Sequence, residues 1–260
     1  MTKIIGYVLA LCIGLSLGLI GGGGSVLAVP ILIYVMGITP KAAIATSLAI
    51  VGIVSLIGII PHWRQGNVNL KTAAFFAPTA MIGAYLGARL ADLPAITETF
   101  QLICFGVVMV AASALMIRKG GKSSPKPEAF LDEESDLLSG EPSHWWIIPL
   151  EGLGIGILTG FVGVGGGFMI VPALVLFGGV AMKEAIGTSL LIIAFNSATG
   201  FLGYISQVQL DWNLVISFTI AASLGTLVGA YFTRFIDAKN LQKGFGYFVL
   251  AVAVFVLIKR

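Results

Sequence analysis

Long apolar runs follow one another along most of the chain, and short polar stretches separate them. Five runs occupy residues 4–20, 26–37, 42–60, 72–90 and 100–117, and five more occupy residues 147–162, 168–180, 185–205, 213–233 and 244–258. About 20 predominantly apolar residues in a helix cross the hydrocarbon core of a bilayer, whereas a surface helix of a soluble protein is apolar on one face only. The pattern predicts an all-α fold, a polytopic transmembrane helical bundle.

The composition agrees with a membrane protein. Hydrophobic residues make up 57% and charged residues 10% of the 260-residue chain, against about 25% charged residues in a soluble domain. The net charge of +3 is scattered over the predicted loops, so we expect a lipid bilayer around the chain and no nucleic-acid partner. Cys12 and Cys104 lie inside apolar runs, where a cysteine usually packs as a small hydrophobe. We expect no metal and no cofactor.

A polar stretch divides the apolar runs into two sets. The whole chain has 15 basic and 12 acidic residues, and ten of these 27 charged residues lie at 118–144, together with Pro125, Pro127 and Pro142. Such a stretch has too little apolar surface to fold by itself. We therefore divide the chain into a first membrane repeat at residues 1–117, a charged linker at 118–146 and a second membrane repeat at 147–260.

The two sets are copies of each other. A shift of 142 residues without a gap places Gly23-Gly24 on Gly165-Gly166, Val29-Pro30 on Val171-Pro172 and Thr46-Ser47-Leu48 on Thr188-Ser189-Leu190. From Gly14 to Leu48, 15 of 35 positions are identical. Shared apolar composition does not produce paired glycines, prolines and Thr-Ser dipeptides in one register. The N-terminal run, which alone could pass for a signal peptide, recurs at residues 147–167, so we expect it to be a retained structural element.

The second repeat is predicted to be inverted in the membrane. Residues 4–37 would form a helix of about 50 Å, too long for a core of about 30 Å, and each glycine from Gly21 to Gly24 disfavours helix by about 1 kcal/mol. The chain therefore breaks there, and the two pieces either both cross or form a re-entrant pair. Both alternatives give each repeat an odd number of crossings.

The distribution of basic residues predicts the orientation. With an odd number of crossings per repeat, one side receives ten of the 15 Lys and Arg residues. The positive-inside rule then places the linker, residues 118–146, in the cytoplasm and both termini outside. Four crossings per repeat would divide the basic residues nine to six, again with the linker inside. We therefore expect a multi-pass protein of the cell (inner) membrane.

The two glycine breaks are the candidate substrate-binding site. Non-helical backbone at membrane depth is tolerated only where it is buried in protein or lines a polar cavity. A short helix starts after each break, and its first N–H groups and the positive end of its dipole favour an anion. Inverted repeats would bring two such helix starts together near the midplane. The candidate binding residues at the breaks are Gly23, Gly24, Ser25, Gly165, Gly166 and Gly167.

The glycines have a second interpretation, in which they only let helices approach closely. We favour close packing for three further pairs, Gly14/Gly18, Gly83/Gly87 and Gly225/Gly229, because small residues four apart are typical of helix contacts in membranes. For the two glycine clusters we favour the binding site.

Uncharged polar residues inside the apolar runs extend the candidate site: Thr46, Ser47, Thr188, Ser189 and Asn196. The four hydroxyls match under the repeat, although Ser and Thr in membrane helices also bond to their own backbone. Asn196 aligns with Val54, so it is a candidate for substrate-specific contact or for helix–helix bonding. Glu151 is a candidate for proton coupling or for an interfacial position. His62 and Trp63 are predicted to lie at the membrane interface.

The motif around the second break resembles a known family. Gly163 to Leu174, with the sequence GVGGGFMIVPAL, and Ala185 to Leu190, with the sequence AIGTSL, are similar to the signature of the TauE/SafE family of sulfite exporters. The first repeat resembles the same signature more loosely, with Ser25 in place of a glycine. The resemblance covers both repeats and implies a bacterial or plant carrier of sulfite, organosulfonates or related small anions. It does not choose among these substrates or between import and export.

These observations predict a secondary transporter of a small sulfur-containing anion, such as sulfite, sulfoacetate or another organosulfonate, working by alternating access and most simply exporting its substrate. A channel-like anion pore is the alternative within transport, and a non-transporting membrane scaffold or assembly factor is the alternative outside it. The chain is not expected to be an enzyme, because no nucleophile–base set stands out. Besides the small anion and the bilayer, a homodimer partner is left open.

Overall fold

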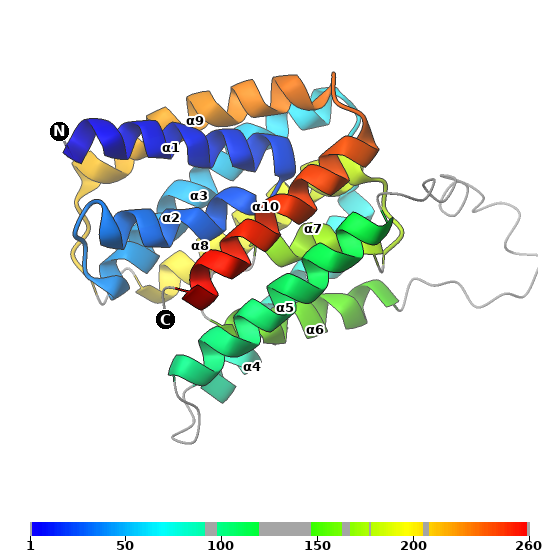
Figure 1. Cartoon of the computed structure of the whole chain (residues 1–260), viewed down its shortest axis with the longest axis horizontal. Helices are drawn as coiled ribbons and strands as arrows, with labels where there is room; N and C mark the ends of the chain where they lie inside the picture. Colours follow the sequence, from blue (N-terminus) through cyan, green and yellow to red (C-terminus); the bar gives the residue numbers. More distant parts are fainter. Residues whose placement is uncertain are drawn as a thin grey trace, which may run out of the picture.

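A computed structural model describes residues 2–91, 98–119, 147–162, 167–176, 178–204 and 208–258. The described residues form helices and connecting loops, with no strand among them. The helices are α1 (Thr2–Ile20), α2 (Gly23–Tyr34), α3 (Pro40–Arg64), α4 (Leu70–Ala91), α5 (Glu98–Lys119), α6 (Ile147–Val162), α7 (Gly167–Leu176), α8 (Met182–Tyr204), α9 (Trp212–Thr233) and α10 (Ala238–Ile258) (Figure 1).

The helices follow the apolar runs that the sequence shows, so the predicted all-α bundle is confirmed. Segments Ala42–Arg64, Met182–Leu202 and Trp212–Thr233, in α3, α8 and α9, are long and apolar enough to cross a membrane. α2 and α7 are short, with 12 and 10 residues. α5 continues through Arg118 and Lys119, which we had placed in the linker. Residues 120–146 of the linker lie outside the described part of the chain.

The first glycine break turns the chain back on itself. Gly21 ends α1 with a φ of +80°, a left-handed conformation that glycine adopts without steric cost. α2 then runs back along α1, as two close contacts show. A Cβ placed on Gly24 would overlap the carbonyl oxygen of Ile13, and one placed on Gly6 would lie 2.8 Å from the sulfur of Met36. The two helices therefore form an antiparallel hairpin that returns to the level at which α1 begins.

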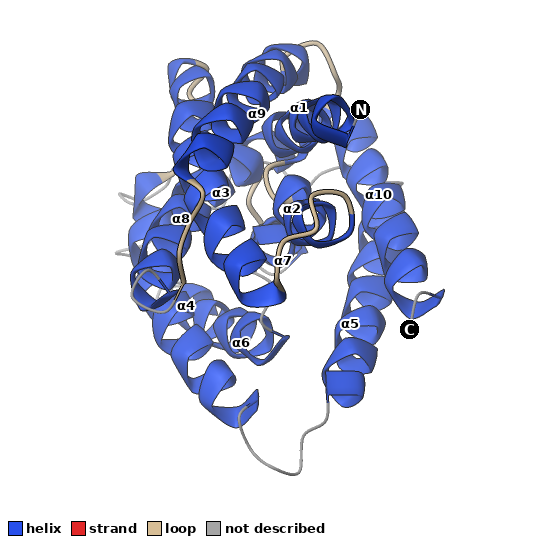
Figure 2. Cartoon of the chain, turned by 90° about the vertical axis from the view of Figure 1, so that its left-hand side faces the viewer, coloured by secondary structure: helices blue, strands red, loops and turns tan. Residues whose placement is uncertain are grey.

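The two short helices lie at the centre of the bundle. Viewed from one end, the longer helices surround α2 and α7 (Figure 2). Burial agrees with this position, since every residue of α7 from Gly167 to Leu174 is buried. In such an arrangement the apolar side chains on the outside of the surrounding helices face lipid. This accounts for the many large hydrophobic residues that are exposed, among them Leu150, Leu202 and Tyr247.

Glycines set the closest helix contacts, and these contacts recur in pairs. A Cβ on Gly14 of α1 would overlap the Ala222 carbonyl of α9, and a Cβ on Gly156 of α6 would overlap the Ala80 carbonyl of α4. Gly225 lies in the same way against Leu11, and Gly83 against Leu153. The predicted packing role is therefore confirmed for Gly14, Gly18, Gly83, Gly225 and Gly229, each of which lies against the backbone of another helix.

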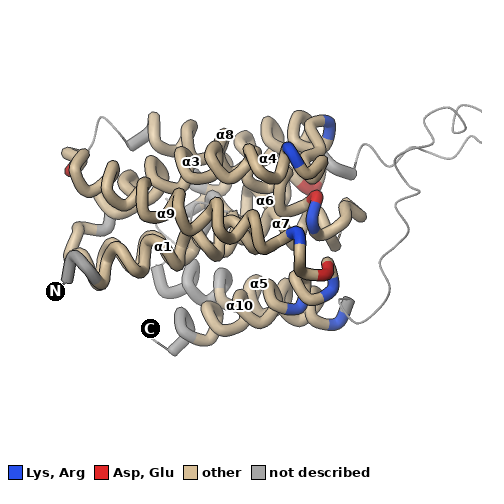
Figure 3. Tube along the Cα trace, turned by 90° about the horizontal axis from the view of Figure 1, so that it is seen from above, with Lys and Arg blue, Asp and Glu red and all other residues tan. Residues whose placement is uncertain are grey.

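Charged residues are concentrated at one end of the bundle. The Lys and Arg residues drawn in blue in Figure 3 gather at the end opposite to the one where α1 begins and α10 ends. At this end Lys183 donates to the carbonyl oxygen of Arg234 at 3.3 Å, and the Arg234 guanidinium lies 4.0 Å above the ring of Tyr231. An aromatic ring beside a basic side chain is typical of the interface between a membrane and water.

Candidate functional site

The starts of α2 and α7 are in direct contact. A Cβ on Gly22, the N-cap residue of α2, would overlap the Gly167 carbonyl and lie 2.9 Å from Cα of Phe168. In the other direction, a Cβ on Gly167 would lie 2.7 Å from Oγ of Ser25. The fold therefore brings together the first turns of the two short helices, as the glycine motifs predicted. Gly165 and Gly166 lie outside the described residues.

The first turn of α2 has no side-chain cap, so its backbone N–H groups are available to a ligand. No side chain caps the helix at Gly22, and the first N–H groups of any α-helix have no partner within the helix. The Ser25 hydroxyl does not act as a cap either, because it donates to the Gly22 carbonyl at 2.8 Å. This helix start therefore offers backbone donors and the positive end of a dipole, which favour an anion.

Gly23 and Gly24 also pack against neighbouring helices. A Cβ on Gly23 would lie 2.7 Å from the Phe248 ring of α10 and 2.8 Å from the Ser16 hydroxyl of α1. Gly24 faces the Ile13 carbonyl of α1. Close packing, one of the two interpretations that the sequence left open, therefore holds for Gly23 and Gly24, and the binding site stays a prediction. A substitution at Gly24 would disturb helix packing whether or not a ligand binds there.

The four candidate hydroxyls on α3 and α8 are buried, and one of them contacts the first break. Thr46, Ser47, Thr188 and Ser189 are all buried. Ser189 donates to the Gly21 carbonyl at 3.2 Å and to the Ile186 carbonyl of its own helix at 2.8 Å. Ser47 donates to its own helix, at the Ile44 carbonyl, at 2.9 Å. Ser189 therefore touches the first break directly and holds the carbonyl with which α1 ends.

Thr188 has a structural role that its position in the motif did not reveal. Its Oγ1 accepts the backbone N–H of Asn69 at 2.9 Å. Asn69 in turn caps α4, since its Oδ1 accepts the N–H of Thr72 at 2.9 Å, and its Nδ2 donates to Glu184 at 2.8 Å. Thr188 thus anchors the loop between α3 and α4, and its hydroxyl has one partner before any substrate binds.

Several buried polar atoms have no hydrogen-bond partner in the described part of the chain. They include Oδ1 of Asn196, Oγ of Ser16 and Oγ of Ser55. A buried polar group without a partner destabilises the folded protein unless a ligand or water pairs with it. Ser16 and Ser55 were not among the residues selected from the sequence. One signal could have pointed to Ser55, since it falls on Ser197 under the 142-residue shift, and both serines are buried. Ser16 has no such counterpart.

The side chain of His62 faces the interior of the protein and is 0% exposed, whereas that of Trp63 is 52% exposed. Neighbouring residues on a helix point in directions about 100° apart, so the two side chains have different surroundings. Their position at the membrane interface stays a prediction. Glu151 of α6 is partly buried, and neither carboxylate oxygen has a hydrogen-bond partner within the described residues.

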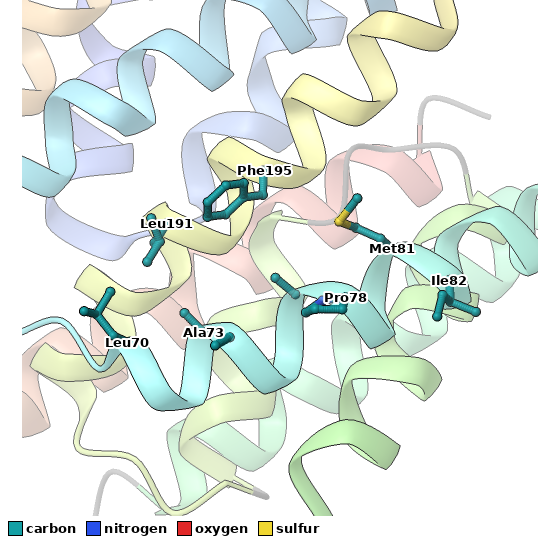
Figure 4. Close-up of a pocket in the computed structure, with 9 residues that line it drawn as sticks. Leu70, Ala73, Pro78, Met81, Ile82, Leu191 and Phe195 are labelled. Atoms are coloured by element: carbon teal, nitrogen blue, oxygen red, sulfur yellow. The ribbon is translucent and has the colours of Figure 1, made fainter.

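A groove between α4 and α8 differs in its chemistry from the polar residues at the glycine break (Figure 4). Its lining is apolar and consists of Leu70, Ala73, Ala74, Ala77, Pro78, Met81, Ile82, Leu191 and Phe195. Leu70, Ile82 and Phe195 are each at least half exposed. A groove without polar groups cannot replace the hydration of an anion, so it is suited to lipid chains and not to the substrate.

Comparison with known proteins decides the family. A family model described as sulfite exporter TauE/SafE matches residues 7–256. The chain belongs to this family. It is 35% identical over 257 residues to a probable membrane transporter protein of Xylella fastidiosa strain 9a5c, covering 94% of this chain and 91% of the relative. The TauE/SafE chain is also similar to two proteins of Bacillus subtilis strain 168.

The first of these is the probable membrane transporter protein YunE, 28% identical over 93% of this chain and 92% of the relative. The second is the probable membrane transporter protein YdhB, 26% identical over 88% of this chain and 90% of the relative. No solved structure matches the chain. Family membership and the apolar helices together make this TauE/SafE protein a membrane transporter.

Proposed function

We propose that the chain is a secondary transporter of a small sulfur-containing anion, such as sulfite, sulfoacetate or another organosulfonate, and that it exports this anion by alternating access. The observation that carries the proposal is the contact between the starts of α2 and α7, where Gly22 lies against Gly167 and no side chain caps α2. The family description, sulfite exporter, supports the substrate class.

The chemistry around this contact suits an anion without a strong base in the site. The first turn of α2 supplies backbone N–H groups without a side-chain cap, and the hydroxyls of Ser25 and Ser189 hold the carbonyls of Gly22 and Gly21 at this break. Hydrogen bonds to a charged acceptor are each worth about 1.5–3 kcal/mol net. A few such bonds replace part of the hydration of a small oxyanion without fixing it permanently, which a carrier requires.

Inverted repeats are the second part of the proposal. Reciprocal contacts support them, because each contact recurs when both partners are shifted by 142 residues: Gly14 on Ala222 with Gly156 on Ala80, and Gly58 on Leu190 with Gly200 on Leu48. Such reciprocity is what an approximate two-fold axis produces. Two halves that pack alike give alternating access when one rocks against the other.

The orientation is the third part. Since the basic residues coloured in Figure 3 gather at the end opposite to the start of α1, the positive-inside rule supports a cytoplasmic location for that end and for the linker at residues 118–146. The hairpin of α1 and α2 then enters from the outer side and returns to it, as a re-entrant pair. An inner-membrane location is part of the same proposal.

Binding and flux of purified protein test the proposal. Sulfite, thiosulfate, sulfoacetate, sulfate and taurine are titrated against protein in detergent, and the tightest ligand is followed into proteoliposomes. A carrier shows saturable uptake and counterflow, in which unlabelled anion inside accelerates entry of labelled anion. Uptake that does not saturate and shows no counterflow indicates a pore. Absence of both binding and flux across the panel indicates a scaffold and overturns the proposal.

A further inference from the structure

His62 is a buried imidazole that the proposed site does not use. It lies in the last turn of α3, and its Nε2 is 3.1 Å from the carbonyl oxygen of Gly18. A carbonyl oxygen only accepts, so Nε2 carries the hydrogen of the neutral ring. Nδ1 is then left as an acceptor, and it is buried without a hydrogen-bond partner among the described residues. The ring is therefore able to take up a proton at Nδ1.

The partner of His62 belongs to the end of α1. Gly18 lies in the last turn of this helix, three residues before Gly21, where the chain turns into α2. The Gly18 carbonyl also accepts a hydrogen bond from Oγ1 of Thr233 at 3.2 Å. Carbonyls in the last turn have no partner within the helix and carry the negative end of its dipole. This position favours a positively charged imidazole, while burial of the ring opposes the charge.

Other charged groups near this end of α3 have partners of their own. The described titratable side chains at or next to the helices packed on α3 are Tyr7, Cys12, Tyr34, Lys183, Glu184, Asp211, Tyr231 and Arg234. Asp211 caps the start of α9, at the other end of that helix from Tyr231 and Arg234. Tyr7, Cys12 and Tyr34 lie toward the far end of the α1–α2 hairpin. Glu184 accepts from Asn69, Lys183 donates to the Arg234 carbonyl, and Arg234 stacks on Tyr231. Arg64, on α3 itself, is exposed.

The geometry points to His62 as a proton-binding site whose occupancy is coupled to the break between α1 and α2, so that transport of the anion is linked to a proton. The coupling has a mechanical reason. A protonated ring needs an acceptor for Nδ1–H, and the described surroundings supply none, so the ring must shift or the site must open. Because Nε2 holds the end of α1, such a shift also moves Gly21, which lies against α8, and Gly22, which lies against the start of α7.

The sign of the coupling follows from charge. A proton at His62 adds positive charge beside the break at which the anion is proposed to bind, so each ligand favours binding of the other. Coupling between two binding sites is reciprocal. We therefore expect the anion to bind more tightly at lower pH, and the proton to bind more tightly when the anion is present. This coupling rests on the proposed function, whereas proton uptake by His62 does not.

Direct titration tests the proton site. The chain has two histidines, so His144→Gln in the linker leaves His62 as the single imidazole. Nitrogen chemical shifts of labelled histidine in this protein are expected to change with pH over the range in which the protein stays folded, and thiosulfate is expected to move the midpoint upward. An imidazole that stays in one protonation state over the whole range overturns the inference, whatever the protein transports.

Binding of thiosulfate, whose charge is constant between pH 5.5 and pH 8, tests the coupling. For one linked proton the dissociation constant changes by up to about tenfold per pH unit within the titration range. We expect this dependence in wild type and in His144→Gln, and its loss in His62→Gln, whose amide keeps a donor for Gly18. A folded His62→Gln protein with the wild-type pH dependence overturns the coupling.

The two proposals fail in different ways. If the His62 imidazole titrates but no anion of the panel binds or crosses, the proposed function fails and the proton site stands. If anions are transported with an affinity that does not change with pH, the inference fails and the proposed function stands. Should His62→Gln not fold, the nitrogen titration of His144→Gln decides, because it leaves His62 in place.

Discussion

The hydroxyl of Ser189 on α8 holds the carbonyl oxygen of Gly21, the residue at which α1 ends, at 3.2 Å. The two residues are 168 positions apart in the chain, so a contact between the repeats fixes the first glycine break. A buried carbonyl at a helix end must find a donor outside its own helix. Ser189 is therefore a residue that positions the break and does not need to touch the substrate.

Replacing this hydroxyl should loosen the break. We expect Ser189→Ala to lower the free energy of unfolding by about 1–3 kcal/mol, the usual effect of leaving a buried polar group unpaired, and to weaken anion binding. Denaturant titration in detergent and binding of the tightest anion measure the two effects. Ser217→Ala is the matched control, because Ser217 donates to Leu214 of its own helix at 3.1 Å. Equal behaviour of the two variants would contradict a role for Ser189 at the break.

The paired glycine contacts give a second prediction. Gly14 lies against the Ala222 carbonyl and Gly156 against the Ala80 carbonyl, so a methyl group at either position forces two helices apart. We expect Gly14→Ala and Gly156→Ala to destabilise the protein by similar amounts, about 1–3 kcal/mol each. Thermal unfolding in detergent measures this effect.

The control lies on the same helix as Gly156. A Cβ on Gly154 meets nothing within 4 Å, so Gly154→Ala should be neutral or stabilising by up to about 1 kcal/mol, the difference in helix propensity. If Gly14→Ala were harmless and Gly156→Ala severe, the two halves would not pack alike, and the proposed inverted repeat would lose its support.

Local pattern was sufficient to predict the helices, the glycine break and the packing glycines. Each of these depends on residues close together in sequence, or on the repeat. The partners of polar side chains could not be predicted, because they come from distant helices: Thr188 is engaged by Asn69, 119 residues away, and His62 by Gly18, 44 residues away. The apolar groove between α4 and α8 also escaped prediction, since only the packing of two helices creates it.

The orientation gives a third prediction. In a background with Cys12 and Cys104 replaced, Ser139→Cys in the linker and Lys239→Cys at the start of α10 should be protected from an impermeant thiol reagent added to intact cells. Asn213→Cys, at the start of α9, should react. Lys239 and Asn213 are both exposed, so accessibility in the folded protein does not distinguish them. Reaction of Ser139→Cys or Lys239→Cys from outside would reverse the assignment of the cytoplasmic face.

Asn196 gives the last prediction, because it separates binding from stability. Its Oδ1 is buried without a partner among the described residues, and the aligned residue of the first repeat is Val54, which is 1% exposed. Asn196→Val therefore places at this position the residue that the other repeat already buries. Removing an unpaired buried amide should raise the free energy of unfolding by about 1 kcal/mol or more.

The same substitution should weaken anion binding if Asn196 serves the substrate. An anion accepts a hydrogen bond from the Nδ2–H group of Asn196 and not from its Oδ1, and losing that bond reduces the affinity by about 1.5–3 kcal/mol, or roughly tenfold to a hundredfold. We expect both effects together: a protein that is more stable and binds the anion less well. Titration calorimetry and thermal unfolding on the same preparation measure them. A more stable protein with unchanged affinity would remove Asn196 from the binding site, and a less stable one would show that its amide bonds two helices.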